Sequence, residues 1–366
     1  MIFDSPASDQ IEVSLFGPGY GECVVLHAGA GDWIIVDSCI DSRSGEVAPL
    51  RYLQDLGVEV ERQVKHIVAS HWHDDHTRGL SRLVEACSRA RFWCPVAMTD
   101  KEFIQYAELH AETFSKQATG GTTEISRVFR VLHAQKRRRS GIAPNVLIHQ
   151  NQVCSIYSLS PSTDRHDDFL QNLAAQMPRV KSVQKRACAL EPNLLSAAIW
   201  IDLPNDGVLL GADVEEKNGQ GWSLIFEEQT CIRTQARVFK VPHHGSHNAH
   251  HDRVWAEVCK PGVEAVLSPF VRGSTRLPTL EDCERICRLA NQAYTTASPV
   301  AGSAQRYEPA VRKEFGELGI KLRAAQPKTG QVRLRGGVCT GFDWSTELSG
   351  PALPLKHIYR QLHDND

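Results

Sequence analysis

The stretch Ser70-His71-Trp72-His73-Asp74-Asp75-His76 decides how the rest of the chain is interpreted. It carries imidazole and carboxylate groups at the spacing His-x-His-x-Asp-His. Imidazole nitrogen combined with carboxylate oxygen suits zinc, iron or manganese, and the lack of a nearby thiolate argues against a closed structural zinc site. The alternative is a polar loop that contains histidines by accident. Because several ligand types lie so close together, we interpret the stretch as a metal-binding loop.

The segments on either side of this loop predict a strand before it and a helix after it. Residues 64–69 are apolar and rich in β-formers, as in a buried strand. Leu80, Leu83, Val84 and Cys87 recur at helical spacing. The metal-binding loop therefore connects a strand to a helix, a place where catalytic groups are often mounted on a rigid scaffold.

The composition describes an ordinary soluble globular protein. The 366 residues, 42% hydrophobic and 23% charged, allow one large domain or two small ones. The formal net charge of -2 gives no global basic field for nucleic acid, although it leaves a local basic groove open. We find no apolar run of the roughly 20 residues that a membrane span needs, and no signal peptide at the N-terminus. The 11 cysteines lack C-x-x-C spacing, which predicts reduced thiols in a cytoplasmic protein.

The N-terminal region predicts half of a β-sandwich. Strands are expected at residues 11–16, 23–26 and 33–38, with glycine-rich turns between them. Asp37 ends the third apolar strand, where a carboxylate is costly to bury unless it has a partner. From its position alone, Asp37 could be a turn-capping residue.

The middle of the chain is less clearly patterned. Helices are expected at about 100–115 and 167–177, with an amphipathic stretch between them and a hairpin around 150–152. The basic run 136–139 is either a solvated helix end or a phosphate-contacting patch near the mouth of the active site. Four further basic residues could extend such a patch: Arg179, Lys181, Lys185 and Arg186.

The second half of the chain supplies further candidate ligands. A strand is expected over residues 192–203, followed by an Asp-Gly hairpin turn and a partner strand that ends at Asp213. Asp213 could alternatively be a helix N-cap. Another strand, near 238–242, runs into His243-His244-Gly245-Ser246. Thr279 should cap a helix, and residues 330–335 look like a late edge strand.

These motifs resemble the metallo-β-lactamase superfamily. The metal-binding loop resembles its signature heptapeptide, while Gly211-Ala212-Asp213 and His243-His244-Gly245-Ser246 resemble a branch that contains the nuclease-like domain of the DNA-uptake protein ComEC. Gly19-Tyr20-Gly21-Glu22 also resembles that branch, with Glu22 where aspartate is usual. The resemblance implies an α/β fold, an αββα sandwich of two mixed sheets. It implies a domain at 1–310 with a helical, partly basic insertion at about 99–190, and a C-terminal extension at 311–366.

The resemblance also implies roles for individual residues. His71 and His73 would hold metal one, Asp75 and His76 metal two, and Asp213 would bridge them. His243 would complete metal two. Asp37 would orient the loop, and His244 would lie near the substrate as a ligand or as an acid for the leaving group. No histidine between the loop and Asp213 has the Gly-His-Ser/Thr context of many superfamily members, so metal one would have only His71, His73 and Asp213 from the protein.

The expected cofactors are two divalent metal ions, zinc or manganese. Together they would activate water at neutral pH and clamp a phosphoryl or acyl oxygen. Our first hypothesis is a phosphodiesterase, specifically a nuclease acting on DNA without membrane attachment. The alternatives are a small-molecule hydrolase for an ester, lactone or thioester, and a partner-dependent subunit with weak turnover. The sequence does not define the oligomeric state.

Overall fold

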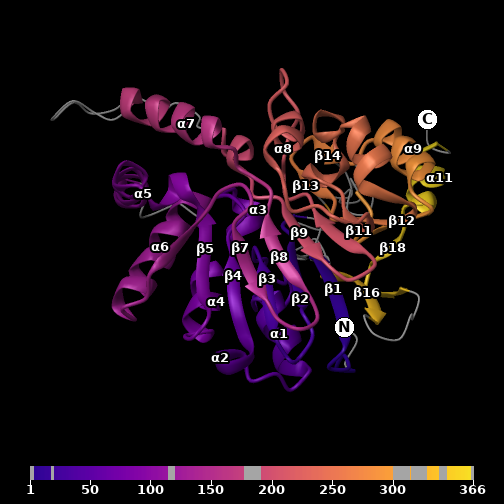
Figure 1. Ribbon diagram of the computed structural model, residues 1–366, viewed down its shortest axis with the longest axis horizontal. Helices are drawn as coiled ribbons and strands as arrows, with labels where there is room; N and C mark the ends of the chain where they lie inside the picture. The colour runs from indigo at the N-terminus through magenta and orange to yellow at the C-terminus, as the bar shows by residue number, and fades with distance from the viewer. Residues whose placement is uncertain are drawn as a thin grey trace.

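The protein consists of two eight-stranded mixed sheets with helices on their outer faces (Figure 1). The computed structural model describes residues 4–17, 20–113, 120–176, 191–299, 314, 328–337 and 344–363. Apolar side chains from both sheets form one buried cluster between them. The predicted αββα sandwich is therefore confirmed.

The first sheet has the order β17-β16-β1-β2-β3-β4-β5-β6. Its strands are β1 (Gln10–Gly17), β2 (Cys23–His27), β3 (Trp33–Val36), β4 (Val64–Val68), β5 (Arg91–Pro95), β6 (Arg139–Ile142), β16 (Gly330–Gly337) and β17 (Ser345–Ser349). The pairs from β1 to β3 are antiparallel, as short glycine turns allow, whereas β3 to β6 are parallel and need longer crossovers. The strands expected in the N-terminal region and before the metal-binding loop are confirmed.

The second sheet has the order β18-β15-β12-β11-β10-β9-β8-β7. Its strands are β7 (Leu147–Gln150), β8 (Ser155–Ser158), β9 (Ile199–Asp202), β10 (Gly207–Leu210), β11 (Ala236–Lys240), β12 (Cys259–Leu267), β15 (Gln292–Thr295) and β18 (Leu353–Pro354). A separate two-stranded hairpin is formed by β13 (Phe270–Arg272) and β14 (Thr275–Leu277). Strands β10, β11 and β12 are parallel to one another, so their carboxyl ends meet at one edge.

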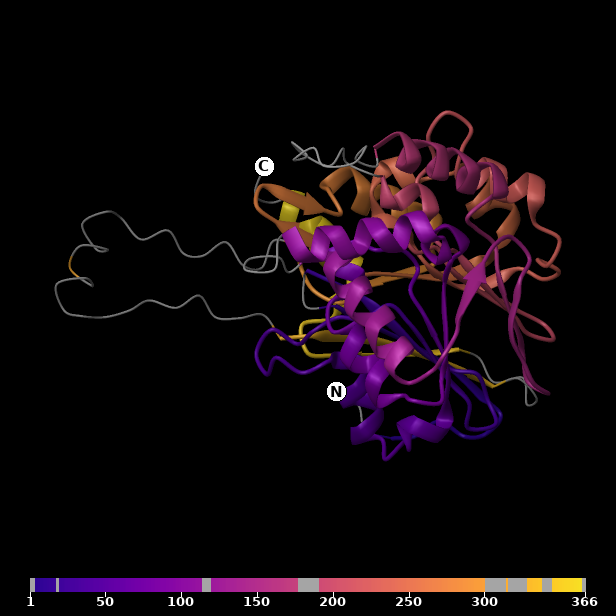
Figure 2. The same cartoon turned by 90° about the vertical axis from the view of Figure 1, so that its left-hand side faces the viewer.

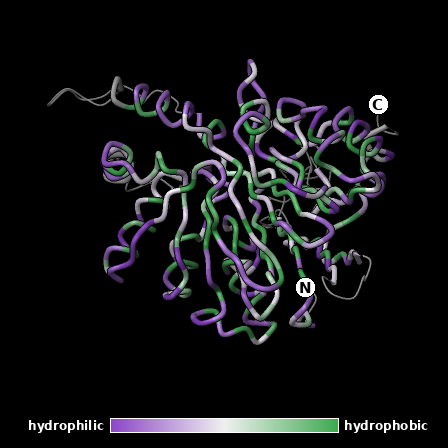
Figure 3. Tube along the Cα trace, viewed as in Figure 1, coloured by the Kyte–Doolittle hydropathy of each residue, from purple (hydrophilic) through white to green (hydrophobic). Residues whose placement is uncertain are grey.

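Helices cover the outer faces of both sheets. The first half carries α1 (Ala48–Asp55), α2 (Val60–Gln63), α3 (Asp74–Thr77), α4 (Leu80–Ala86), α5 (Lys101–Thr113) and α6 (Gly121–Ala134). The second half carries α8 (Trp222–Glu228), α9 (Leu280–Leu289) and α11 (Leu355–His363), and α7 (Thr163–Gln176) lies near the junction. Figure 2 shows α5 lying across one end of α6. The hydropathy colouring of Figure 3 places hydrophobic residues along the strands and polar residues on the outer helices. No helix within the described ranges is long and apolar enough to cross a membrane.

Two predicted strands are corrected. The stretch 192–203 begins as a 3₁₀ turn at Pro192–Leu195, because proline favours the first position of a helix, and only Ile199–Asp202 joins the sheet. The stretch at 330–335 is an interior strand, since β16 pairs with β1 on one side and β17 on the other.

The predicted domain boundary at residue 310 lies outside the described residues. Before this boundary, β12 and β15 lie in the second sheet. After it, β16 lies in the first sheet. Within the predicted insertion at 99–190, β6 joins the first sheet while β7 and β8 join the second.

Candidate active site

The candidate site lies where loops after several strands meet at one edge of the sandwich. His71 and His73 follow β4, Asp213 follows β10, and His244 follows β11. One turn of helix, α3, carries Asp75 and His76. Side chains from the two halves of the chain converge here, since His244 Nε2 lies 3.1 Å from Asp75 Oδ2.

Two groups of side chains could each hold a metal ion. The first consists of His71, His73 and Asp213, and the second of Asp75, His76, Asp213 and His244. Within each group, one potential ligand atom from every residue lies within 4.8 Å of the others. The first group contains the three protein ligands that the sequence predicted for metal one.

Asp213 is common to both groups. Its Oδ2 atom lies 3.3 Å from His76 Nε2, 3.7 Å from His244 Nε2 and 3.9 Å from His71 Nε2. The Asp213 side chain is buried. One carboxylate oxygen thus faces imidazoles of both groups, which is the arrangement expected of a bridging ligand.

The two adjacent histidines lie in different surroundings, and His244, which the resemblance left open as a ligand or an acid, is the one in the second group. His243 and His244 have φ values of 46° and 56°, and Gly245 follows at 84°, so the chain turns sharply through the left-handed region. This turn directs His244 Nε2 to within 3.1 Å of Asp75 Oδ2. His243 instead has its Nδ1 atom 3.2 Å from Glu215 Oε1 and 3.0 Å from Asn248 Oδ1. In this geometry His244, not His243, completes the second group.

His244 is also less suited to the acid role that the sequence left open for it. Its Nε2 atom points into the second group, and its Nδ1 atom lies 3.0 Å from the carbonyl oxygen of Ser268. Both ring nitrogens are therefore engaged on the floor of the site.

Asp37 lies behind the second group and contacts it through His76. Its Oδ2 atom is 2.8 Å from His76 Nδ1 and accepts the Ser70 hydroxyl at 2.6 Å, while its Oδ1 atom accepts the Ser70 backbone N–H at 2.7 Å. Ser70 Oγ is also 3.0 Å from His71 Nδ1. Asp37 therefore touches the far side of one ligand and the start of the loop, as a positioning residue would.

The sequence analysis missed a buried ion pair beneath the site. The Lys240 ammonium contacts the Glu22 carboxylate, donates to the carbonyl oxygen of Ala212 at 2.9 Å, and lies 3.9 Å from Asp213 Oδ1. Glu22 Oε2 is 3.7 Å from His244 Nδ1. A lysine within the apolar strand Val238-Phe239-Lys240-Val241 was the available signal, because an unpaired buried charge is costly.

The carboxylates give the two groups opposite electrostatic character. Burial lowers the pKa of His71 well below its usual value, and burial also lowers the pKa of His73. Burial acts in the same direction on His76, but the carboxylates of Asp213, Asp75 and Asp37 overcome it and raise the His76 pKa well above the usual value. The pKa of His244 is likewise raised against burial, chiefly by Asp213 and by the hydrogen bond that His244 donates to Asp75. These carboxylates therefore favour positive charge on the imidazoles of the second group.

The residues present fit divalent metal ions. The buried atoms His76 Nε2 and Asp213 Oδ1 have no hydrogen-bond partner among the described residues. Buried polar groups without a partner are rare and call for an explanation, and a bound cation would supply one here. The donor atoms are imidazole nitrogens and carboxylate oxygens, in line with zinc or manganese.

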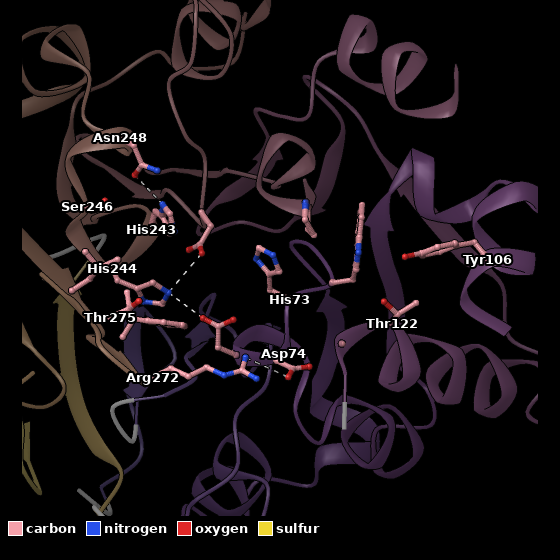
Figure 4. Close-up of a pocket in the computed structure, with 17 residues that line it drawn as sticks. His73, Asp74, Tyr106, Thr122, His243, His244, Ser246, Asn248, Arg272 and Thr275 are labelled. Carbon is pink, nitrogen blue, oxygen red and sulfur yellow. Dashed lines mark hydrogen bonds and ion pairs between the residues drawn. The ribbon is translucent and has the colours of Figure 1, made fainter. Parts of the chain in front are cut away.

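A cavity of about 690 Å³ opens above the two groups (Figure 4). One wall is the β13–β14 hairpin, which contributes Phe270, Arg272, Thr275 and Leu277. The other residues that line it are Trp72, His73, Asp74, Asp75, Tyr106, Gly121, Thr122, Pro192, Asp213, His243, His244, Ser246 and Asn248. Candidate ligands form the floor, so a substrate in this cavity would reach both groups.

The basic run at 136–139 does not lie near the cavity. The N-terminal residues of α6, Gly121 and Thr122, line the cavity, and the run follows the other end of this 14-residue helix, roughly 20 Å away at 1.5 Å per residue. Arg137 donates to the carbonyl oxygen of Val84 at 2.8 Å, and Arg139 stacks on Phe129. Of the two alternatives for this run, the structure therefore does not support a phosphate-contacting patch at the mouth. The other basic residues proposed for the patch lie outside the described residues.

Comparison with known proteins supports the superfamily. A family model described as the metallo-beta-lactamase superfamily matches residues 16–108, which include the metal-binding loop. No curated protein sequence was found to match the chain.

Three solved structures illustrate the similarity. YhfI from Bacillus subtilis, a metallo-beta-lactamase fold protein, is 14% identical, with 71% of this chain and 85% of that chain covered and a TM-score of 0.37. Zn²⁺-bound PqqB from Methylobacterium extorquens is 10% identical, with 59% and 58% covered and a TM-score of 0.32. AidC, a dizinc quorum-quenching lactonase, is 12% identical, with 52% and 55% covered and a TM-score of 0.28.

The family match to residues 16–108 and the two-sheet sandwich are consistent with the metallo-β-lactamase fold, and the two groups of side chains could hold metal ions. The family match does not distinguish the ComEC-like branch, which stays a prediction.

Proposed function

We propose that this protein is a metal-dependent phosphodiesterase that acts on DNA. The observation that carries the proposal is the shared Asp213, which places two metal-binding groups side by side on the floor of one cavity. Divalent ions held by these residues would polarise a phosphoryl oxygen and supply a nucleophile at neutral pH.

The chain's own residues hold and orient this centre. His71, His73 and Asp213 would bind one ion, and Asp75, His76, Asp213 and His244 the other. Asp37 fixes the ring of His76, and the carbonyl oxygen of Ser268 fixes the ring of His244. Such outer contacts keep ligand atoms in position and commonly affect metal affinity by about 10- to 100-fold.

The choice of DNA rests on the motifs shared with the ComEC-like branch and on a cationic residue in the cavity wall. Arg272 from the β13–β14 hairpin is the one Lys or Arg among the described cavity-lining residues. Arginine suits phosphate because its planar guanidinium offers several N–H donors. A cytoplasmic location remains part of this proposal.

The proposal is tested with purified protein that has been stripped of metal and reloaded with zinc or manganese. We expect cleavage of single- or double-stranded DNA by the wild type and none by Asp213→Asn. If protein with intact metal content leaves every nucleic acid uncut, the nuclease proposal is wrong. If neither the wild type nor Asp75→Ala binds metal, the partner-dependent subunit becomes the better interpretation.

A small-molecule ester hydrolase is the second candidate, and the cavity favours it in one respect. A volume of about 690 Å³ lies within the range of roughly 300–1,000 Å³ typical of small-ligand pockets, and the apolar side chains of Trp72, Phe270 and Leu277 line it. Turnover of a lactone or thioester at a higher kcat/KM than any phosphodiester would select this function.

A further inference from the structure

Arg272 lies at the edge of the cavity in a position suited to an anionic part of the substrate. It is carried by β13, two residues beyond Phe270, whose ring centroid is 5.2 Å from that of His244. Alternate residues of a strand point to the same side, so Arg272 extends the wall that Phe270 begins. Figure 4 shows Arg272 directed toward Asp74, on the rim beside the metal-binding loop.

The Arg272 guanidinium is held by an aromatic residue rather than by a strong ion pair. It stacks over the Tyr20 ring with its central carbon 5.2 Å from the ring centroid, and its Nη1 donates to Tyr20 Oη at 2.8 Å. Burial, together with Asp74 and Asp75, raises the pKa of Tyr20 to about 12, so the phenol keeps its proton. Tyr20 therefore orients the guanidinium without cancelling its charge.

Arg272 retains donors for a ligand. Its Nη1 atom is 3.8 Å from Asp74 Oδ2, too far for a hydrogen bond. Asp74 also accepts the backbone N–H of Gly121 at the start of α6. Within the ranges that the structure describes, Tyr20 is the hydrogen-bond partner of Arg272, while the guanidinium has five N–H donors and its side chain is 63% exposed.

The negative charges around the cavity explain why the Arg272 guanidinium would be important for binding an anionic substrate group. The described lining residues include the carboxylates of Asp74, Asp75 and Asp213, which repel an anion unless cations balance them. Metal ions bound at the floor would balance the negative charge of the scissile phosphate. For a second phosphate bound outside the floor, Arg272 is the one permanent positive charge among the described residues that line the cavity.

We propose that Arg272, held by Tyr20, forms a subsite for the phosphate that flanks the scissile phosphodiester in a nucleic-acid strand. This inference rests on the proposed function and makes it more specific, because it selects a polymer with successive phosphates over an isolated diester.

The first test compares a trinucleotide, which has a flanking phosphate, with bis(p-nitrophenyl) phosphate, which has none. We expect Arg272→Gln to lower kcat/KM for the trinucleotide about tenfold, mainly through KM, and to leave the simple diester within about twofold. Arg272→Lys should be intermediate, since it keeps the charge but loses the planar fork. The matched control is Arg276→Gln on β14, whose side chain donates to the carbonyl oxygen of Pro299 and does not line the cavity.

The second test measures binding of a labelled, non-hydrolysable trinucleotide analogue to the metal-loaded protein by fluorescence anisotropy, so it does not depend on turnover. Arg272→Gln should weaken binding about tenfold and reduce the slope of log K against log salt by about 0.7, the value for one contact to a single strand. Arg276→Gln should match the wild type in both quantities.

The outcomes separate the two proposals. An equal loss on both substrates, or unchanged trinucleotide binding and salt slope in Arg272→Gln, would overturn the subsite. Failure of metal-loaded wild type to cleave either diester would overturn the phosphodiesterase, while the anisotropy and salt slope would still decide whether Arg272 binds phosphate.

Discussion

The two candidate metal groups share one carboxylate oxygen but differ in their surroundings. The second group has four protein ligands, all buried, and contacts behind them from Asp37, Ser268 and Glu22. The first group has three ligands, and His73 borders the cavity. A fuller and better supported ligand set binds metal more tightly. We therefore expect the second group to fill first and the first group to exchange its ion more readily.

Loss of the shared ligand should have the largest effect. Asp213→Asn removes the charge that both groups use, so the protein should lose both metal ions. Activity should fall by about 1,000-fold, equivalent to about 4 kcal/mol of transition-state stabilisation. Metal analysis after gel filtration, with kcat/KM, checks this. Asp252→Asn, at an aspartate whose side chain is 96% exposed, is the control. Retention of one tightly bound ion in Asp213→Asn would contradict sharing.

Single-group substitutions should then separate the two sites. His73→Ala should remove one metal equivalent and leave the tighter ion in place, because His73 belongs only to the first group. Asp75→Ala should instead abolish the tighter binding step. Isothermal titration of metal-free protein with zinc measures both steps. If both substitutions weaken the same step, the division into two groups is wrong.

A smaller effect is expected from the residue behind the second group. Asp37→Asn should weaken the tighter step by about 10- to 100-fold and change the weaker step less, because Asp37 orients His76 directly. Asp41→Asn is a matched control, since Asp41 also accepts hydrogen bonds from loop groups, Ser44 and Thr329, but touches no candidate ligand. Equal weakening of both steps, with normal thermal stability, would show that Asp37 acts on the whole loop.

In metal-free protein, the pKa values of His76 and His71 should be shifted in opposite directions from the usual histidine value. The raised pKa of His76 means that its protonation stabilises the fold below about pH 6.5, and that this stabilisation is lost as pH rises through the raised value. The lowered pKa of His71 has the reverse sign, so its contribution is present above about pH 6.5 and is lost as pH falls.

Histidine NMR shifts measured against pH check this contrast. A metal-free protein in which His71 and His76 titrate together near pH 6.5 would contradict it. Calorimetry in buffers of different ionisation enthalpy should also show more proton release at the tighter binding step.

Much of this arrangement could be predicted from the sequence because it is local. The apolar run before His71 and the helical spacing after Arg78 fixed the place of the metal-binding loop, and the turns between short strands predicted β1 to β3. Asp37 was recognisable because it ends an apolar strand. The structure confirms these elements, and Asp37 contacts His76 and Ser70.

The features that could not be predicted from the sequence depend on backbone geometry or on contacts between residues far apart in the chain. The position of His243 outside the second group follows from the left-handed backbone of His243 and His244, which the sequence motif does not reveal. The Lys240–Glu22 pair joins β11 to the turn before β2, and Arg272 becomes a cavity residue only when a small hairpin folds over the floor. Such contacts need the tertiary fold.

Anomalous diffraction from crystals grown with zinc or manganese tests the central claim most directly. We predict two peaks about 3.5–4 Å apart on either side of Asp213 Oδ2, with higher occupancy beside Asp75, His76 and His244. No peak within bonding distance of Asp213, or a single peak elsewhere in the protein, would contradict it.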